Sequence, residues 1–308
     1  MTIASHPDAS LPQTLRRNWL PFAFLLPAGL ILLVFMAFPM ANSIMLSFRS
    51  WNGMSDPVWV GFRNYRLMLG DRIFLLALFN TAYFTVATVL LQSILPLLVA
   101  ALLSSGVRGG TFFRTMYFMP VIISLAISGL LWAMIYEPNF GILNSFLRAI
   151  GIDSWTRLWL ADRRTVMPSI IAVSVWQSLG FYLVIYYAAI QGIPTELYDA
   201  AKMDNASAVR RFWHVTVPML RPVIVLVVVL NTINGIKVFD QIWVMTAGGP
   251  NHASDTLGTY LYSSAFGAMG SSNPQLGYAT AIAIVILALS AVLSVIQIRI
   301  GKRMEFEQ

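Results

Sequence analysis

Cysteine is absent from this chain of 308 residues. Its absence excludes a disulfide framework and any metal site built from thiolates. The three histidines, His6, His214 and His252, lie far apart in the sequence and lack the spacing of metal ligands. The sequence therefore predicts no metal site.

Signatures of common enzymes are missing as well. No G-x-x-x-x-G-K-[ST] loop is present to hold a nucleotide phosphate, and neither G-x-S-x-G nor H-E-x-x-H occurs. We therefore predict a non-catalytic chain that does not hydrolyse ATP itself.

Charged side chains are scarce. Charged residues (Asp, Glu, Lys and Arg) make up 11% of the chain, and hydrophobic residues make up 57%. A soluble domain of this length is not expected to have this composition. The net charge of +7 comes from basic residues scattered among loops rather than gathered in a stripe, so it does not predict binding to nucleic acid.

Six segments are apolar over the roughly 20 residues that a helix needs to cross a bilayer. They are residues 20–45, 73–103, 116–135, 166–190, 223–245 and 278–298. These runs do not alternate as the strands of an outer-membrane barrel do, and in lipid only helices then satisfy their own backbone hydrogen bonds. We predict an all-α, polytopic membrane protein with six transmembrane helices in residues 20–298, preceded by a polar segment, 1–19, and followed by a short tail, 299–308.

The distribution of Lys and Arg sets the expected orientation. With both termini in the cytoplasm, slightly more than half of the 20 basic residues lie on that side, and residues 49–72, 136–165 and 246–275 face outside. The first apolar run is longer than the core of about 7 to 15 residues of a signal peptide, and no A-x-A site follows it, so we interpret it as the first span.

The longest polar interruption between two apolar segments is residues 194–222, PTELYDAAKMDNASAVRRFWHVTVPMLRP. Pro194 and Thr195 predict a helix start, in which the threonine oxygen caps free amides. Asn205 tolerates the left-handed conformation of a tight turn, and Ser207 can cap a second short helix. The segment is thus predicted to form helix, turn and helix at a membrane surface.

This segment resembles the EAA loop in the membrane subunits of binding-protein-dependent ABC importers, which reads roughly P-x-x-L-x-E-A-A-x-x-D-G-A in the carbohydrate branch. Asp199 stands where the family usually has glutamate, and Asn205 stands where it usually has glycine. Asparagine is the commonest non-glycine residue at positive φ, so the turn should be preserved. The matching positions are Asp199, Ala200, Ala201, Asp204, Ala206, Phe212 and Pro218. The resemblance implies that these residues, with Glu196 and Asn205, bind a cytoplasmic ATPase subunit, although an ordinary amphipathic loop between two spans remains an alternative.

Three further phrases resemble sugar permeases. They are VGFRNYRLML at 60–69 with Asn80 and Thr81 following, EPNFGILNSFL at 137–147, and T-x-G-G-P at 246–250. The resemblance covers about residues 60–300 and implies a type I ABC importer permease fold in a bacterial inner membrane.

The resemblance also implies partners. These are a second, similar permease subunit, two ATPase subunits that bind ATP and Mg, a periplasmic or lipid-anchored substrate-binding protein, and a carbohydrate; no cofactor is expected in this chain. A permease for another polar solute, such as a glycerol phosphate ester, would need a strongly basic path, whereas the spans contain only Lys237. A self-contained secondary transporter or membrane enzyme is the alternative from another class.

Polar side chains inside spans are costly and mark candidate functional positions. Asn231 and Asn234 are three apart and share a helix face near the middle of the fifth span, where the resemblance places substrate contacts. Ser124, Gln177 and Gly180 are the matching candidates from neighbouring spans. Hydrogen bonds between helices use the same residue types, so a structural role stays open for each.

Lys237 and Asp240 are also three apart in the fifth predicted span. On one helix face they are expected to form a structural pair near its outer end.

Overall fold

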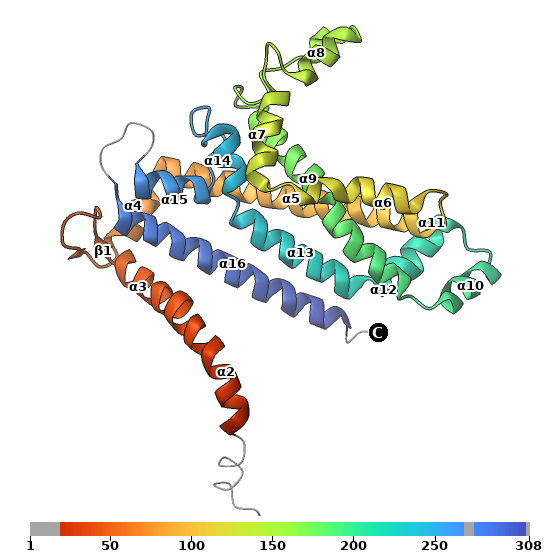
Figure 1. Ribbon diagram of the computed structural model, residues 1–308, viewed down its shortest axis with the longest axis horizontal. Coiled ribbons are helices and arrows are strands. Elements are labelled where there is room, and N and C mark those ends of the chain that lie inside the picture. Colours follow the sequence, from red (N-terminus) through yellow and green to blue (C-terminus); the bar gives the residue numbers. More distant parts are fainter. Residues whose placement is uncertain (1–18, 268–273, 306–308) are drawn as a thin grey trace, which may run out of the picture.

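The computed structural model describes residues 19–267 and 274–305, and this part of the chain is mostly helical (Figure 1). Two short antiparallel strands pair Arg49 with Trp59 and Ser50 with Val58. The elements up to the second long connection are α2 (Trp19–Leu32), the π-helix η1 (Leu33–Ala37), α3 (Phe38–Ser47), β1 (Arg49–Ser50), β2 (Val58–Trp59), α4 (Arg63–Gly70), α5 (Arg72–Ser104), α6 (Gly110–Phe118), the 3-10 helix η2 (Met119–Ile122), α7 (Leu125–Ile135), α8 (Ile142–Ala149) and the 3-10 helix η3 (Asp153–Trp155). The later elements are α9 (Val166–Gln191), α10 (Thr195–Met203), α11 (Ala208–Arg211), the π-helix η4 (Phe212–Thr216), α12 (Val217–Met219), α13 (Arg221–Ile236), α14 (Asp240–Thr246), α15 (Leu257–Phe266) and α16 (Leu276–Glu305).

Within the described residues, four helices are long and apolar enough to cross a membrane. They cover Phe24–Ser47, Arg72–Ser104, Val166–Gln191 and Leu276–Gly301. Two bent pairs pass the same test together: Gly110–Ile122 with Leu125–Ile135, and Ala208–Met219 with Arg221–Ile236. Counted as one span each, the pairs bring the number of candidate spans to six, the predicted number, although the second pair covers residues 208–236 rather than 223–245. Residues 1–18 and 306–308, which belong to the predicted terminal segments, lie outside the described residues.

The third span, predicted over residues 116–135 with a proline bend near its start, is bent next to Pro120. Its two halves, α6 with η2 and α7, meet at 98°. Pro120 lies in the 3-10 turn of η2, and Ser124 then adopts an extended backbone from which its hydroxyl accepts a hydrogen bond from the Ile127 amide at 3.4 Å. Proline disfavours continuation of the preceding helix and a capping serine starts a new one, so the chain turns here.

The prediction of one helix over residues 223–245 is wrong. α13 ends at Ile236 after 16 residues, and α14 starts only at Asp240. Lys237 is the C-cap of α13, whereas Asp240 opens the next helix, so the two do not share a helix face. The described residues contain no ion pair between them.

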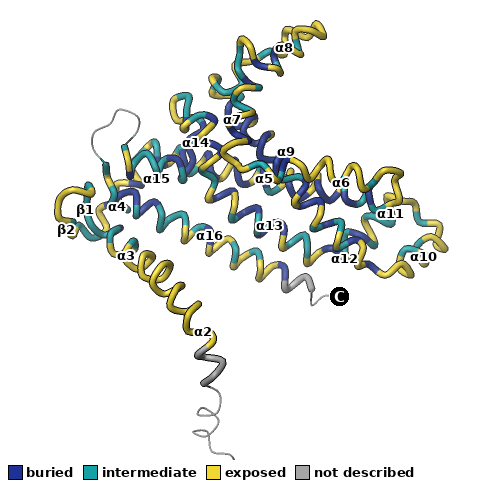
Figure 2. The backbone as a smooth tube through the Cα atoms, in the orientation of Figure 1, coloured by how far each residue is buried: buried dark blue, intermediate teal, exposed yellow. Residues whose placement is uncertain are grey.

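The buried core lies around α9, which packs along α5 and touches α13, as the dark centre of Figure 2 shows. Tyr186 and Leu183 of α9 are fully buried beside Leu97 of α5 and Val227 of α13. α16 packs on α13 and on α3. Residues 24–42, which cover most of α2, η1 and the first half of α3, are by contrast mostly apolar and exposed (Figure 2).

Connections gather at two ends of the molecule. Figure 1 shows β1, α4 and α15 at the left and α8 at the top, while α10, α11 and the C-terminal end lie at the right. The connections that the sequence assigns to opposite sides of a membrane are therefore separated in space, as the predicted topology requires.

Candidate functional site

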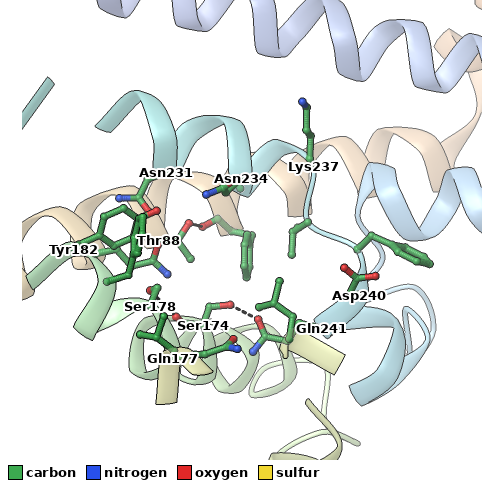
Figure 3. Close-up of a pocket in the computed structure, with 18 residues that line it drawn as sticks. Thr88, Ser174, Gln177, Ser178, Tyr182, Asn231, Asn234, Lys237, Asp240 and Gln241 are labelled. Carbon is green, nitrogen blue, oxygen red and sulfur yellow. Dashed lines mark hydrogen bonds between the residues drawn. The ribbon is translucent and has the colours of Figure 1, made fainter. Parts of the chain in front are cut away.

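A cavity of about 410 Å³ lies between α5, η2, α7, α9, α13 and α14. Hydroxyl and amide side chains from four helices reach its wall (Figure 3). They are Thr88 and Gln92 of α5, Ser174, Gln177, Ser178 and Tyr182 of α9, Asn231 and Asn234 of α13, and Gln241 of α14. On α9 these positions recur every three or four residues, which is the spacing of one helix face.

Several of these polar groups have no hydrogen-bond partner. Asn231 is 1% exposed, and neither its amide nitrogen nor its oxygen is paired. Gln177 donates from Nε2 to the Ile123 carbonyl at 2.8 Å but leaves Oε1 unpaired. Gln241 accepts a hydrogen bond from Ser174 and leaves Nε2 unpaired. A buried polar group without a partner is costly, so the wall offers both donors and acceptors that a ligand or water can satisfy.

Charge is nearly absent from this wall. Lys237 and Asp240 are its only charged lining residues, and both are exposed. Figure 3 shows the Lys237 side chain directed away from the cavity. The arrangement therefore suits a neutral ligand that carries many hydroxyl or amide groups.

Of the residues predicted for a substrate path, Gln177, Asn231 and Asn234 line the cavity, and Ser124 and Gly180 do not. Ser124 is the N-cap of α7. Gly180 lets α9 pass close to the end of α6, because a Cβ there would come within 2.2 Å of the Tyr117 carbonyl oxygen. These two residues shape the surrounding wall.

Thr88 and Gln92 line the cavity but are not among the residues predicted from the sequence. The available signal was their spacing of four within α5, which places them on one helix face. Ser174 was likewise not predicted, whereas Ser178, Tyr182 and Gln241 belong to the polar side chains inside spans that the sequence marks as candidates. Their contribution depends on how α9 and α14 face each other.

The 194–222 loop forms the predicted helix, turn and helix. Asn205 has a φ of 57°, which confirms the left-handed turn, and the Ser207 hydroxyl accepts a hydrogen bond from the Arg210 amide at 3.3 Å, which confirms the cap. The turn is closed by a hydrogen bond from the Ala206 amide to the Ala201 carbonyl at 2.9 Å. The cap predicted at Thr195 is wrong: Pro194 occupies the N-cap position, and no side chain caps α10.

The two faces of this loop differ. Glu196, Asp199, Ala200 and Asp204 are exposed on α10 and its end, and Ala201 is half-buried. The other face of the loop packs on the body. The Tyr198 hydroxyl lies 3.0 Å from the Thr216 hydroxyl, and Phe212 packs against the buried cluster around Tyr186. Pro218 is half-buried. One face of the loop is thus fixed to the body, while its exposed face carries the acidic residues and Ala200.

The model of a family described as "Binding-protein-dependent transport system inner membrane component" matches residues 94–306. Among relatives, the chain is 38% identical over 286 residues to the probable ABC transporter permease protein YurN of Bacillus subtilis, covering 92% of this chain and 96% of that protein. It is 35% identical over 274 residues to the diacetylchitobiose uptake system permease protein NgcF of Streptomyces coelicolor, covering 85% and 76% of the two chains.

Solved structures agree with the fold. The chain matches a bacterial ABC transporter involved in the import of the acidic polysaccharide alginate with a TM-score of 0.81 and 26% identity, over 95% of this chain and 98% of the other. The alginate transporter in complex with its pentasaccharide-bound periplasmic protein gives a TM-score of 0.82 at 24% identity, over 96% and 98% of the chains.

Proposed function

This chain belongs to the family of binding-protein-dependent transport system inner membrane components, and we propose that it is the permease subunit through which an ABC importer carries a neutral sugar or sugar derivative across the bacterial inner membrane. Membership in this family displaces the secondary-transporter and membrane-enzyme alternatives. The relatives named for diacetylchitobiose, lactose and multiple-sugar transport support the carbohydrate class.

The observation that carries the proposal is the cavity with unpaired amides and no inward-facing cation. Sugar hydroxyls both donate and accept, so several of them can satisfy the unpaired atoms of Asn231, Gln177 and Gln241. The Tyr182 and Phe181 rings offer apolar surface to the C–H face of a pyranose. A glycerol phosphate ester or an acidic saccharide would need cations that this wall does not direct inward. We therefore place the substrate among neutral saccharides.

The 194–222 loop is proposed to bind the ATPase subunit. Its support is the exposed surface of Glu196, Asp199 and Ala200 on a helix held to the body by Tyr198. Two copies of the ATPase, each binding ATP and Mg, would hydrolyse ATP to drive transport, because this chain has no nucleotide-binding motif of its own.

A second permease subunit and a binding protein complete the proposed assembly. The apolar, exposed α2 and α3 suit contact with lipid and a partner's helices. A periplasmic binding protein is present in the solved alginate complex, whose permease shares this fold.

The transport proposal is tested with the reconstituted complex in proteoliposomes containing ATP. Uptake of labelled diacetylchitobiose, lactose and maltose is compared with uptake of alginate oligosaccharides and glycerol 3-phosphate, each with the binding protein encoded beside this subunit. Uptake confined to neutral sugars supports the proposal, and preferential uptake of the anionic solutes contradicts it.

The docking proposal is tested separately with Ala201→Trp. A bulky side chain on the small-residue face should block close approach, so the ATPase should no longer co-purify while the spans stay folded. Ala161→Trp, in the exposed connection between η3 and α9, is the matched control. A normal complex and full uptake with Ala201→Trp would show that the ATPase binds elsewhere.

Orientation is tested with single cysteines, which are clean probes in a chain that has none. Ser55→Cys and Val209→Cys place thiols at exposed positions at the two ends of the molecule. We expect an impermeant maleimide to label residue 55 in intact spheroplasts and residue 209 only after the membrane is opened; the reverse pattern would invert the topology.

A further inference from the structure

Residues 246–259, called here the 246–259 loop, contain the T-x-G-G-P phrase and enclose a buried carboxylate. Asp255 is 5% exposed; one of its oxygens accepts a hydrogen bond from the Thr259 hydroxyl at 2.8 Å, and the other lies 2.5 Å from Nδ1 of His252. Gly248 has a φ of 88°, and a Cβ there would come within 2.0 Å of the Asp255 carboxylate. Glycine is therefore required at this position both by backbone conformation and by the packed carboxylate.

Hydroxyl groups close the loop on itself. The Thr246 hydroxyl lies 2.8 Å from the Ser254 hydroxyl, which donates to the Gly249 carbonyl at 2.6 Å. Ser254 is fully buried. The start of the phrase is thus tied to the residue next to Asp255.

The 246–259 loop is anchored to α5 by Asn80 and Thr81. The Asn80 amide donates to the carbonyls of His252 at 3.1 Å and of Asp255 at 2.9 Å. The Thr81 hydroxyl accepts from the Leu257 amide at 2.9 Å. Two sequence phrases more than 160 residues apart, Asn80 with Thr81 and T-x-G-G-P, therefore form one hydrogen-bonded unit.

The same loop supports the break between α13 and α14. The Thr256 hydroxyl donates to the Val238 carbonyl at 3.2 Å, and a Cβ on Gly258 would come within 2.6 Å of that carbonyl oxygen. Val238, Phe239, Asp240 and Gln241 line the cavity, whereas no residue of the 246–259 loop does. The loop therefore contacts the segment that forms the cavity wall without lining the cavity itself.

We propose that the 246–259 loop is a positioning device, in which the Asp255 cluster holds residues 237–241 of the cavity wall against α9 without contacting the substrate. A break in a helix leaves backbone groups without intrahelical partners, and an external brace fixes its geometry. Thr256 and Gly258 supply that brace, and Asn80 fixes the brace to the longest helix of the bundle. The inference rests on the proposed function only in taking the cavity as the transport path.

The test measures the labelling of an introduced cysteine, so it needs no substrate. The chain itself contains no cysteine, so only the introduced thiol of this subunit reacts. A reporter thiol at Asp240→Cys sits in the supported wall, and one at Ser178→Cys sits on α9 across the cavity. The rate of reaction with a small water-soluble maleimide is measured for the assembled transporter in nanodiscs. Thr256→Val removes the hydroxyl that reaches Val238, and Thr259→Val removes the donor to Asp255.

We expect each valine variant to change the labelling rate at residue 240 several-fold and to leave residue 178 within the error of the wild type. Thr259→Ser keeps the hydroxyl and should restore the wild-type rate. Thr280→Val is the matched control, since the Thr280 hydroxyl bonds only within α16, to the Gly277 carbonyl. Equal rates at residue 240 in the wild type, Thr256→Val and Thr259→Val would overturn the inference, as would an equal change at residues 178 and 240.

Sugar uptake by the same variants separates this inference from the proposed function. If the wild type carries no neutral sugar, the transport proposal fails while the labelling result still decides the positioning role. Where the wild type does carry sugar, Thr256→Val should carry less sugar per ATP hydrolysed, because the wall no longer meets the substrate in one geometry. If the labelling rate changes but the amount of sugar carried per ATP hydrolysed does not, the loop does not act on the transport path, and its assignment to that path is overturned.

Discussion

The cavity and the 246–259 loop are neighbouring polar regions that use the same side-chain chemistry in opposite ways. In the loop, the buried side chains of Asp255 and Thr259 have partners, as does the Asn80 side chain of α5 that anchors the loop. In the cavity, Asn231, Gln177 and Gln241 each keep an unpaired atom. Paired buried groups stabilise one conformation, whereas unpaired ones cost stability and are retained where a ligand satisfies them. The contrast separates a supporting unit from a binding surface.

Asn80→Ala should give the largest loss of stability. It leaves the buried Asp255 carbonyl without the Asn80 amide and the His252 carbonyl with only the Asp255 amide, and an unsatisfied buried group costs about 1 to 3 kcal/mol. The unfolding temperature of the purified complex should fall clearly, whereas Asn139→Ala, at an exposed asparagine, should leave it unchanged. Equal unfolding temperatures for the two variants would mean that the loop is not held by Asn80.

Asn231→Leu should have the opposite effect on stability. Its amide is buried with both polar atoms unpaired, so an apolar side chain of similar size should stabilise the fold by about 1 to 3 kcal/mol. Sugar uptake should fall at the same time. A lower unfolding temperature with normal uptake would instead assign Asn231 to contacts between helices.

Asn234→Ala should affect transport and leave stability unchanged. Asn234 lines the cavity and is exposed, so its side chain contributes little to the buried core. Losing one hydrogen bond to a sugar hydroxyl costs about 1 kcal/mol, which corresponds to several-fold weaker transport. Uptake kinetics measured beside basal ATPase activity test this, and unchanged uptake would remove Asn234 from the substrate path.

The smallest expected effect is a difference in pH dependence between two carboxylates. Burial raises the pKa of Asp255, and the hydrogen bonds from His252 and Thr259 only partly oppose it. At Asp71, which caps α5, burial also acts to raise the pKa, but hydrogen bonds from the Tyr260 and Tyr278 hydroxyls and from the α5 amides outweigh it and hold the pKa below its ordinary value.

The two shifts have opposite consequences for stability. The protonated Asp255 side chain contributes to the free energy of unfolding below its unfolded-state pKa, and this contribution is lost as pH rises through its higher folded-state pKa. The ionised Asp71 side chain contributes above its unfolded-state pKa, and this contribution is lost as pH falls through its lower folded-state pKa. From acid to neutral pH, the unfolding temperature of Asp71→Asn should therefore fall relative to the wild type, and that of Asp255→Asn should rise relative to it. Parallel curves for both variants would contradict these assignments.

The sequence determined the features that depend on neighbouring residues. Six apolar segments follow from composition over about 20 residues, because each backbone must satisfy itself in lipid. In the 194–222 loop, the turn at Asn205 and the cap at Ser207 were predicted correctly, since both depend on a few adjacent residues. The motifs also placed the chain in its family.

Only the tertiary structure decided where the spans break and which polar groups meet. Hydropathy stays high across residues 116–135 and 223–245, so it does not reveal the turns at Ser124 and Lys237, which caps and outside contacts stabilise. Likewise, Asn80 is paired and Asn231 is unpaired because of what lies opposite each in space, although both are asparagines within apolar helices. Whether a buried amide supports the fold or awaits a ligand depends on contacts between distant elements, which spacing along one helix does not contain.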